Sequence, residues 1–284
     1  MAAGGAAEPG RRALRFHKSA EWYNRGSLPQ MEHPFWTWAL LCVSAFLAGA
    51  VNSIAGGGTL LTFPSLLSVL GPVQANATST LALLPGSLAA AWGYRRELAE
   101  CGPQLGRLWP PSLAGGIIGS LLVIRLPERV FAGMVPWLLV CASTLMLVQK
   151  PLAQRLGAHP HAAPSAGTLA AIVVFQFFVG VYGGYFGAGI GILMLSSLAF
   201  VGIPNIHQMN AVKSVLAATM NGITAAIFAV SGVIAWKYAI AMAVAASAGG
   251  YTGARLARRT KAGYVRAVVV LIGFAVAAYS WWSR

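Results

Sequence analysis

The chain contains no aspartate, and charged residues of every kind are scarce. Its six acidic residues are all glutamates, against 20 lysines and arginines, and only 9% of the 284 residues are charged. Soluble domains usually carry about 25% charged residues, so the composition argues against a large water-soluble enzyme. The lack of aspartate also excludes aspartyl catalysis, EF-hand loops and the usual carboxylate sites for Mg²⁺.

Cysteine is equally scarce, and the common catalytic motifs are missing. Cys42, Cys101 and Cys141 stand without CxxC spacing, which predicts neither a disulfide framework nor a zinc site. His159 and His161 lie in a proline-rich segment without a third ligand, so we expect no metal and no cofactor. No HExxH, GxSxG or GxxxxGK[ST] motif occurs, which argues against zinc proteases, hydrolases and P-loop ATPases.

What the chain does have is apolar residues and positive charge. Hydrophobic residues make up 57% of the sequence, the formal net charge is +14, and the mean hydropathy is +0.67. Such a charge can indicate nucleic-acid binding, but in an apolar chain basic loops on the cytoplasmic side of a bilayer account for it. We therefore predict an all-α polytopic membrane protein whose surroundings are lipid, with no nucleic-acid partner.

Eight apolar segments approach the roughly 20 residues that a spanning helix needs. They cover 35–55, 77–94, 108–125, 130–148, 168–186, 211–234, 238–256 and 264–282. Two shorter apolar segments, 59–70 and 190–202, reach only about 20 Å each as helices. We expect these two to be broken or re-entrant, which gives 8 to 10 transmembrane helices in all.

The two halves of the chain repeat the same pattern. At an offset of 131, Phe46-Leu-Ala-Gly49-x6-Gly56-Gly-Gly58-x6-Ser65 matches Phe177-Phe-Val-Gly180-x6-Gly187-Ala-Gly189-x6-Ser196. At an offset of 134, Asn76-Ala matches Asn210-Ala, and Gly115-Gly-x-x-Gly119 matches Gly249-Gly-x-x-Gly253. The sequence therefore predicts an N-terminal polar tail (1–34), a first membrane repeat (35–148), an inter-repeat loop (149–167) and a second membrane repeat (168–284), with about five hydrophobic elements in each repeat.

The number of crossings in each repeat decides how the repeats are related. An odd number would turn the second repeat upside down, the inverted arrangement common in secondary transporters, whereas four crossings would leave the repeats parallel. Placing the basic clusters 95–107, 149–155 and 255–261 together on the cytoplasmic side favours the inverted arrangement. The same choice places the N-terminus and its basic tail outside, so the orientation stays open.

Each repeat contains a glycine cluster, a short apolar segment and then a polar helix start. The glycines are Gly56, Gly57 and Gly58 in the first repeat and Gly187, Gly189 and Gly191 in the second; the polar residues are Asn76, Thr78 and Ser79, and then His207, Asn210, Lys213 and Ser214. Glycine permits the turns of a broken helix, and polar helix starts attract anions. We expect the two helix starts to face each other and form one anion cradle, with these polar residues as substrate ligands. Gly115, Gly119, Gly249 and Gly253 are instead predicted to serve close helix packing.

Lys213 is the most informative of these residues. It lies in an apolar helix, where a central lysine costs about 2.5–3.5 kcal/mol, and neither that helix nor its repeat mate contains an acid. Either its side chain extends to the interface, or it faces a cavity and binds an anionic ligand. Its repeat mate is Ser79, so one half supplies a charge and the other a hydroxyl. His207 is either a titrating neighbour or an ordinary loop residue.

At these residues the sequence resembles the TauE/SafE family of sulfite and organosulfonate exporters, over about residues 40–284. The matching motifs are Ala48-Gly49-x-x-Asn52-x-x-x-Gly56-Gly-Gly58 with Pro64, Asn76-Ala-Thr-Ser79, Gly183-Gly-Tyr-Phe-Gly187-Ala-Gly189, and Asn210-Ala-Val-Lys213. The resemblance implies a multi-pass inner-membrane transporter of small anions. Leu195 in place of Pro64, and Lys213 in place of a second serine, suggest an asymmetric site dominated by the second repeat.

The leading hypothesis is a secondary transporter that exports small anions, such as sulfite or organosulfonates, by alternating access between its repeats. Proton-coupled anion uptake through His207 or Lys213 is the alternative within transport. A non-transporting accessory or scaffold protein is the alternative from another class. An intramembrane enzyme is not expected, because Ser214 and Lys213 are adjacent and point apart. A homodimer is compatible with so small a bundle.

Overall fold

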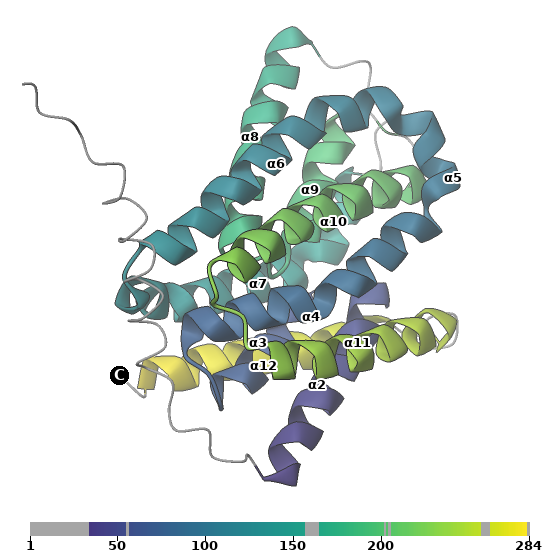
Figure 1. The fold of residues 1–284 in the computed structure, drawn as a ribbon. Helices are drawn as coiled ribbons and strands as arrows, with labels where there is room; N and C mark the ends of the chain where they lie inside the picture. Colours follow the sequence, from purple (N-terminus) through teal and green to yellow (C-terminus); the bar gives the residue numbers. More distant parts are fainter. Residues whose placement is uncertain are drawn as a thin grey trace, which may run out of the picture.

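The computed structural model describes residues 34–54, 57–156, 165–201, 203, 206–256 and 262–282, and within these ranges it contains helices and turns but no strand. The predicted polar tail and the histidines at 159 and 161 lie outside the described residues. In the first half the elements are α2 (Phe35–Ile54), α3 (Thr59–Leu67), α4 (Pro72–Gly93), α5 (Arg95–Leu98), η1 (Ala99–Cys101), α6 (Gly102–Arg125) and α7 (Glu128–Leu156). In the second half they are α8 (Ala166–Tyr185), α9 (Ile190–Phe200), α10 (Ile206–Val230), α11 (Trp236–Leu256) and α12 (Ala262–Trp282) (Figure 1).

Each apolar segment of the sequence is a helix, but several boundaries differ from the prediction. α4 begins at Pro72 rather than 77, α10 at Ile206 rather than 211, and α6 at Gly102 rather than 108, because a hydropathy pattern does not mark polar or glycine-rich first turns as helical. Proline at the first position of α4 is compatible with a helix start, since its missing N–H has no partner there anyway. α7 continues through 149–156, so this part of the predicted inter-repeat loop is helical.

Five of the described helices are long and apolar enough to cross a membrane. They are Phe35–Asn52, Arg95–Arg125, Glu128–Val148, Ala166–Tyr185 and His207–Val230. The all-helical class is therefore confirmed, together with several candidate spans, and the larger count of 8 to 10 stays a prediction. Large apolar side chains are exposed on the outer helix faces, among them Trp36, Trp137, Phe178, Val244 and Leu271, as expected for a surface in contact with lipid.

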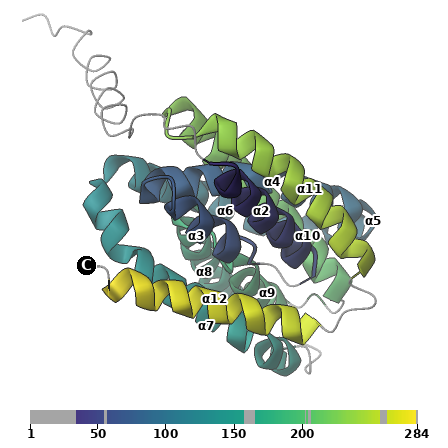
Figure 2. The ribbon, with the colours of Figure 1, turned by 90° about the horizontal axis from the view of Figure 1, so that it is seen from below.

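The helices of the two halves interlock. α2 packs along α11, and α8 packs along α6, so the first helix of each half lies against a later helix of the other half. α4 packs on α10, and α7 on α12 (Figures 1 and 2). The short helix α3 lies among α2, α4, α7 and α12, and its Leu60, Phe63 and Leu66 are fully buried.

Glycines allow the backbones of these helix pairs to touch. A Cβ on Gly249 of α11 would collide with the carbonyl oxygen of Phe46 on α2, and one on Gly115 of α6 with that of Phe177 on α8. A Cβ on Gly119 would likewise collide with the Val181 backbone. The packing role predicted for these three glycines is confirmed, whereas the surroundings of Gly253 lie outside the described side chains.

The glycine contact between α2 and α11 yields a direct test. Gly249→Ala should lower the free energy of unfolding by about 1–3 kcal/mol, because the added methyl forces the two helices apart. Gly250→Ala is the matched control, since its Cβ would approach only the Gly49 oxygen, at 3.8 Å. Thermal unfolding of the purified full chain in detergent measures both variants. Equal losses in the two variants would contradict the backbone contact.

Candidate functional site

Two breaks in the helices meet against the middle of α7. Gly57 (φ +88°), Gly187 (+77°) and Gly189 (+76°) adopt left-handed backbone conformations, which cost other residues about 1–2 kcal/mol. A Cβ on Gly57 would lie 3.0 Å from Met146 Sδ, and one on Gly189 would lie 3.5 Å from the Ala142 oxygen. Because residues four apart share one face of a helix, the break before α3 and the break before α9 lie against the same short stretch of α7.

The other glycines predicted to form breaks have different roles. Gly58 is in the right-handed helical region, and its Cβ would lie 2.6 Å from the carbonyl oxygen of Ala48. Gly191 lies within α9, where a Cβ would lie 3.4 Å from Lys213 Cδ. These two positions need small residues for space rather than for a turn. Gly56 lies outside the described residues.

One side chain forms a hydrogen bond across each break, and neither residue was among the predicted site residues. Asn52 Oδ1 accepts a hydrogen bond from the Gly58 amide at 2.9 Å. The Tyr182 hydroxyl donates to the Ala188 oxygen at 2.7 Å. Asn52 was part of the family motif, which was a usable signal. Tyr182 had none, because an aromatic residue in an apolar helix is most often simply packed.

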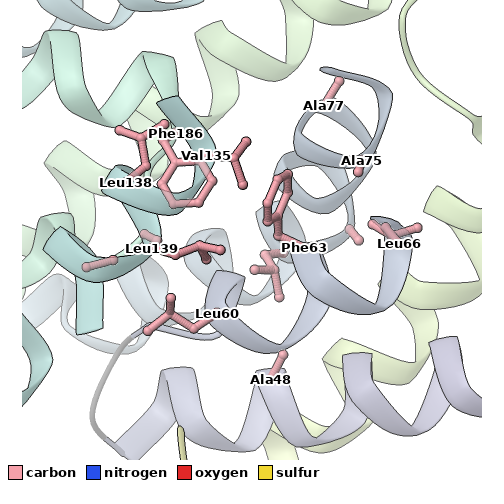
Figure 3. Packing of buried hydrophobic residues seen from close by; sticks show 14 of the residues in the cluster. Ala48, Leu60, Phe63, Leu66, Ala75, Ala77, Val135, Leu138, Leu139 and Phe186 are labelled. Carbon is pink, nitrogen blue, oxygen red and sulfur yellow. The ribbon is translucent and has the colours of Figure 1, made fainter. Parts of the chain in front are cut away.

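An aromatic pair joins the two halves at this point. The rings of Phe63 on α3 and Phe186, directly after α8, are 5.1 Å apart and nearly perpendicular (Figure 3). Both side chains are almost completely buried, and Val135, Leu138 and Leu139 of α7 belong to the same cluster. Sequence reasoning missed this aromatic pair, because two phenylalanines among many carry no pattern.

The polar residues at the start of α4 are engaged in holding the fold together. Asn76 Nδ2 donates to the Tyr185 oxygen at 3.0 Å, and Thr78 Oγ1 accepts from the Ala235 amide at 3.1 Å. Ser79 shares a 2.6 Å hydrogen bond with Thr62 of α3. Asn76, Thr78 and Ser79 are buried, and Asn76 Oδ1 has no partner. That unpaired atom is a hydrogen-bond acceptor, so it does not attract an anion.

The start of α10 is different, because it carries a charge. Lys213 is half-buried, its Nζ donates to Asn210 Oδ1 at 2.9 Å, and its aliphatic stem lies against Gly191. Within the described part of the chain, no carboxylate forms an ion pair with Lys213. Ser214 is buried beside it in sequence, and His207 is exposed at the helix start.

The structure does not bring the two polar helix starts together, and the predicted single cradle is wrong. α4 and α10 run antiparallel: Thr78 near the start of α4 bonds to Ala235, beyond the end of α10, and Gln208 near the start of α10 bonds to Glu100, beyond the end of α4. The two helices touch where Asn221 Nδ2 donates to Ser87 Oγ at 3.2 Å. Ser79 and Lys213 each precede this contact by about 12 Å along their own helices, in opposite directions.

Two separate polar sites therefore take the place of one. We call Thr62 and Ser79, between α3 and α4, the neutral niche, and Gly191, Asn210 and Lys213, between α9 and α10, the cationic niche. In each niche the first turn of a short helix lies against the second or third turn of the helix that follows. Of the two niches, only the cationic niche contains a charged side chain.

The sequence profile described as "Sulfite exporter TauE/SafE" matches residues 41–280. The chain belongs to the TauE/SafE family. Similar curated proteins are named as membrane transporters. The "Probable membrane transporter protein ORF9" of a Sinorhizobium species is 30% identical over 243 residues, which cover 84% of this chain and 90% of that protein. A "Probable membrane transporter protein" of Haemophilus influenzae is 29% identical, over 84% of this chain and 92% of the relative. YfcA of Escherichia coli K12 is 29% identical, over 82% and 86%.

No solved structure matches the chain. Membership of the TauE/SafE family and the apolar helices together indicate a multi-pass membrane protein of the transporter class. The resemblance seen in the sequence is thereby confirmed. The substrate roles of Asn76, Thr78, Ser79, His207, Asn210, Lys213 and Ser214 stay predictions.

The break before α9 can be tested in this TauE/SafE protein without knowledge of the substrate. Gly189→Ala should lower the free energy of unfolding by about 1–2 kcal/mol, because alanine is strained at this positive φ. Gly222→Ala, inside α10 with no atom within 4 Å of the new Cβ, should instead raise it by about 0.5–1 kcal/mol. Both values come from unfolding in detergent. A neutral Gly189→Ala variant would contradict the turn.

Proposed function

We propose that the protein is a secondary transporter that exports small anions, sulfur oxyanions such as sulfite or organosulfonates, across the inner membrane. The transporter class follows from the family. The anionic substrate is supported chiefly by one observation. Lys213 lies inside the candidate span His207–Val230, half-buried and without a carboxylate partner among the described residues. A cation in such a place is costly unless a ligand or water compensates it.

The mechanism that we propose is alternating access between inverted repeats. Ser87 and Asn221 are repeat mates at the offset of 134, and they bond to each other. A residue and its mate meet only close to the axis that relates the two halves. Because α4 and α10 also run antiparallel, this axis lies across the helices, which supports inversion rather than a parallel duplication.

The pair α7 and α12 supports the same relation. The rings of Trp137 and Trp281 lie 4.8 Å apart in an edge-to-face arrangement, while further along the pair a Cβ on Gly273 would collide with Ser143 Oγ. Residue numbers rise along α7 as they fall along α12, so these equivalent helices are antiparallel as well. The pair α4–α10 and the pair α7–α12 thus both support an antiparallel relation between the repeats.

The short helices account for the odd number of passes that we propose for each half. α3 folds back along α2, since Gly58 bonds to Asn52 at one end and Ser65 shares a 2.8 Å hydrogen bond with Ser44 at the other. α4 then resumes the direction of α2. Irregular backbone of this kind persists at membrane depth only where protein encloses it, and the enclosure by α7 meets that requirement.

Export of a dianion through such a protein requires no coupling ion. A membrane potential of about 100 mV, negative inside, contributes about 2.3 kcal/mol per charge. A dianion gains twice that, which corresponds to a gradient of roughly a thousandfold. Among the described residues, no carboxylate pairs with Lys213 to relay a coupling cation.

The anion hypothesis predicts ligand-induced stabilisation. Sulfite, thiosulfate or methanesulfonate at about 100 times its Kd should stabilise the wild type by roughly 2.7 kcal/mol, and Lys213→Ala should abolish the shift. Lys237→Ala, which removes an equal charge from an exposed position on α11, should retain it. Thermal unfolding of the purified chain against this anion panel is the measurement.

Equal shifts in all three proteins would place binding elsewhere in the chain. If no anion stabilises the folded wild type, the result would favour the hypothesis of a non-transporting accessory or scaffold protein. Flux in vesicles then separates export from uptake, because both predict the same stabilisation.

A further inference from the structure

We infer that the cationic niche is the loading site on the cytoplasmic side and that the neutral niche is its outward-side counterpart. This inference rests on the proposed anion transport and adds the side on which the anion is captured. It follows from the direction of the helices, the placement of the basic clusters and the unequal chemistry of the two niches.

Three helices of the bundle run in the same direction. α4 and α11 begin together, because Thr78 near the start of α4 accepts a hydrogen bond from Ala235, directly before α11, and the two helices pack against each other. α7 begins at the same end, since a Cβ on Gly71, directly before α4, would lie 2.6 Å from Glu128 Oε1. All three helices therefore finish at the opposite end.

The basic clusters follow the ends of these same helices. Residues 95–107 follow α4, and residues 149–155 belong to the last turns of α7. Arg255 of the third cluster is in the last turn of α11, and residues 257–261 come next in the sequence but lie outside the described residues. The clusters hold nine basic residues: Arg95, Arg96, Arg107, Lys150, Arg155, Arg255, Arg258, Arg259 and Lys261. At the other end, the loops and helix ends between 125 and 129 and between 231 and 237 hold three.

This imbalance orients the bundle in the membrane. Short loops rich in lysine and arginine stay on the cytoplasmic side, so the end that carries the three clusters is cytoplasmic. α2 runs in the same direction as α4, which puts Phe35 at the outer end. The basic residues of the tail before 34 act against this orientation. They lie outside the described residues, and three internal clusters outweigh one.

The two niches lie toward opposite faces. α10 begins at the cytoplasmic end, where Gln208 Nε2 donates to Glu100 Oε2 at 2.6 Å, and Lys213 follows seven residues after Ile206, about 10 Å along the helix. Ser79 follows seven residues after Pro72, about 10 Å from the outer end of α4. The niches are thus at matching depths, one toward each side of the membrane.

Their chemistry is unequal in a way that suits capture from inside. Lys213 presents a positive charge, whereas the nearby segment 95–107 adds little, because its three arginines are offset by Glu97 and Glu100. In the neutral niche, Ser79 and Thr62 satisfy each other and are buried. An anion therefore binds more tightly on the cytoplasmic side and leaves from a niche that holds it weakly.

Sidedness can be measured with membrane vesicles that carry the full chain. Exchange of labelled sulfite is followed in everted vesicles, which expose the cytoplasmic face, and in right-side-out vesicles. We expect the wild type to need a lower half-saturating sulfite concentration in everted vesicles. Lys213→Ser should raise that concentration at least tenfold in everted vesicles and less than twofold in right-side-out vesicles.

Three further variants make the result decisive. Lys213→Arg should retain the wild-type sidedness, and Lys237→Ser should leave both faces unchanged. The double variant Ser79→Lys/Lys213→Ser exchanges the repeat mates and should move the tighter binding to right-side-out vesicles. If the double variant does not fold, Lys213→Ser and Lys213→Arg still decide the question.

An equal loss on both faces in Lys213→Ser, or a loss on the outer face alone, would overturn the inference while leaving anion transport intact. Absence of sulfite, thiosulfate and methanesulfonate exchange in the wild type would overturn the proposed function itself. The two failures are therefore distinguishable.

Discussion

Backbone polar groups at membrane depth need partners within the protein, and the interior of this protein is arranged around that constraint. The helices after α2 and α8 are interrupted, which leaves amides and carbonyls that lipid cannot satisfy. Asn52 bonds to an amide at the first break, Tyr182 bonds to a carbonyl at the second, and Asn76 reaches across from the other half to the last carbonyl of α8. α7 covers both breaks. These hydrogen bonds and the packing on α7 supply partners that lipid cannot provide at the two interruptions.

Side chains of the first half form hydrogen bonds with backbone groups of the second half, so the two halves depend on each other for their stability. Asn76 and Thr78 of α4 bond to the second half, while glycine-lined contacts join α2 to α11 and α6 to α8. Neither half could bury its broken helix alone. The same bonds engage polar side chains of the first half, and Lys213 is the charged side chain on which the proposed anion binding rests.

Much of the helical framework was predictable from sequence, because hydropathy reports the length of apolar runs. The breaks at Gly57, Gly187 and Gly189 followed from glycine clusters beside short runs, and the packing glycines followed from their spacing. The partners of polar side chains were not predictable. Nothing in the pattern of Asn76 reveals that its amide holds a distant carbonyl, and nothing in that of Gly191 reveals that it makes room for Lys213. The larger error concerned the relative direction of α4 and α10. Their first turns share a sequence pattern, but the two helices pack antiparallel, so these turns lie at opposite ends of the pair.

The hydrogen bond between Ser87 and Asn221 has a consequence for movement. When two inverted halves exchange conformations, each position takes on the surroundings of its mate, and only points on the axis between the halves are mapped onto themselves. A bond between mates lies at such a point. In the alternating access that we propose, this bond is therefore the part of the bundle that stays in place while the two niches open in turn toward opposite faces of the membrane.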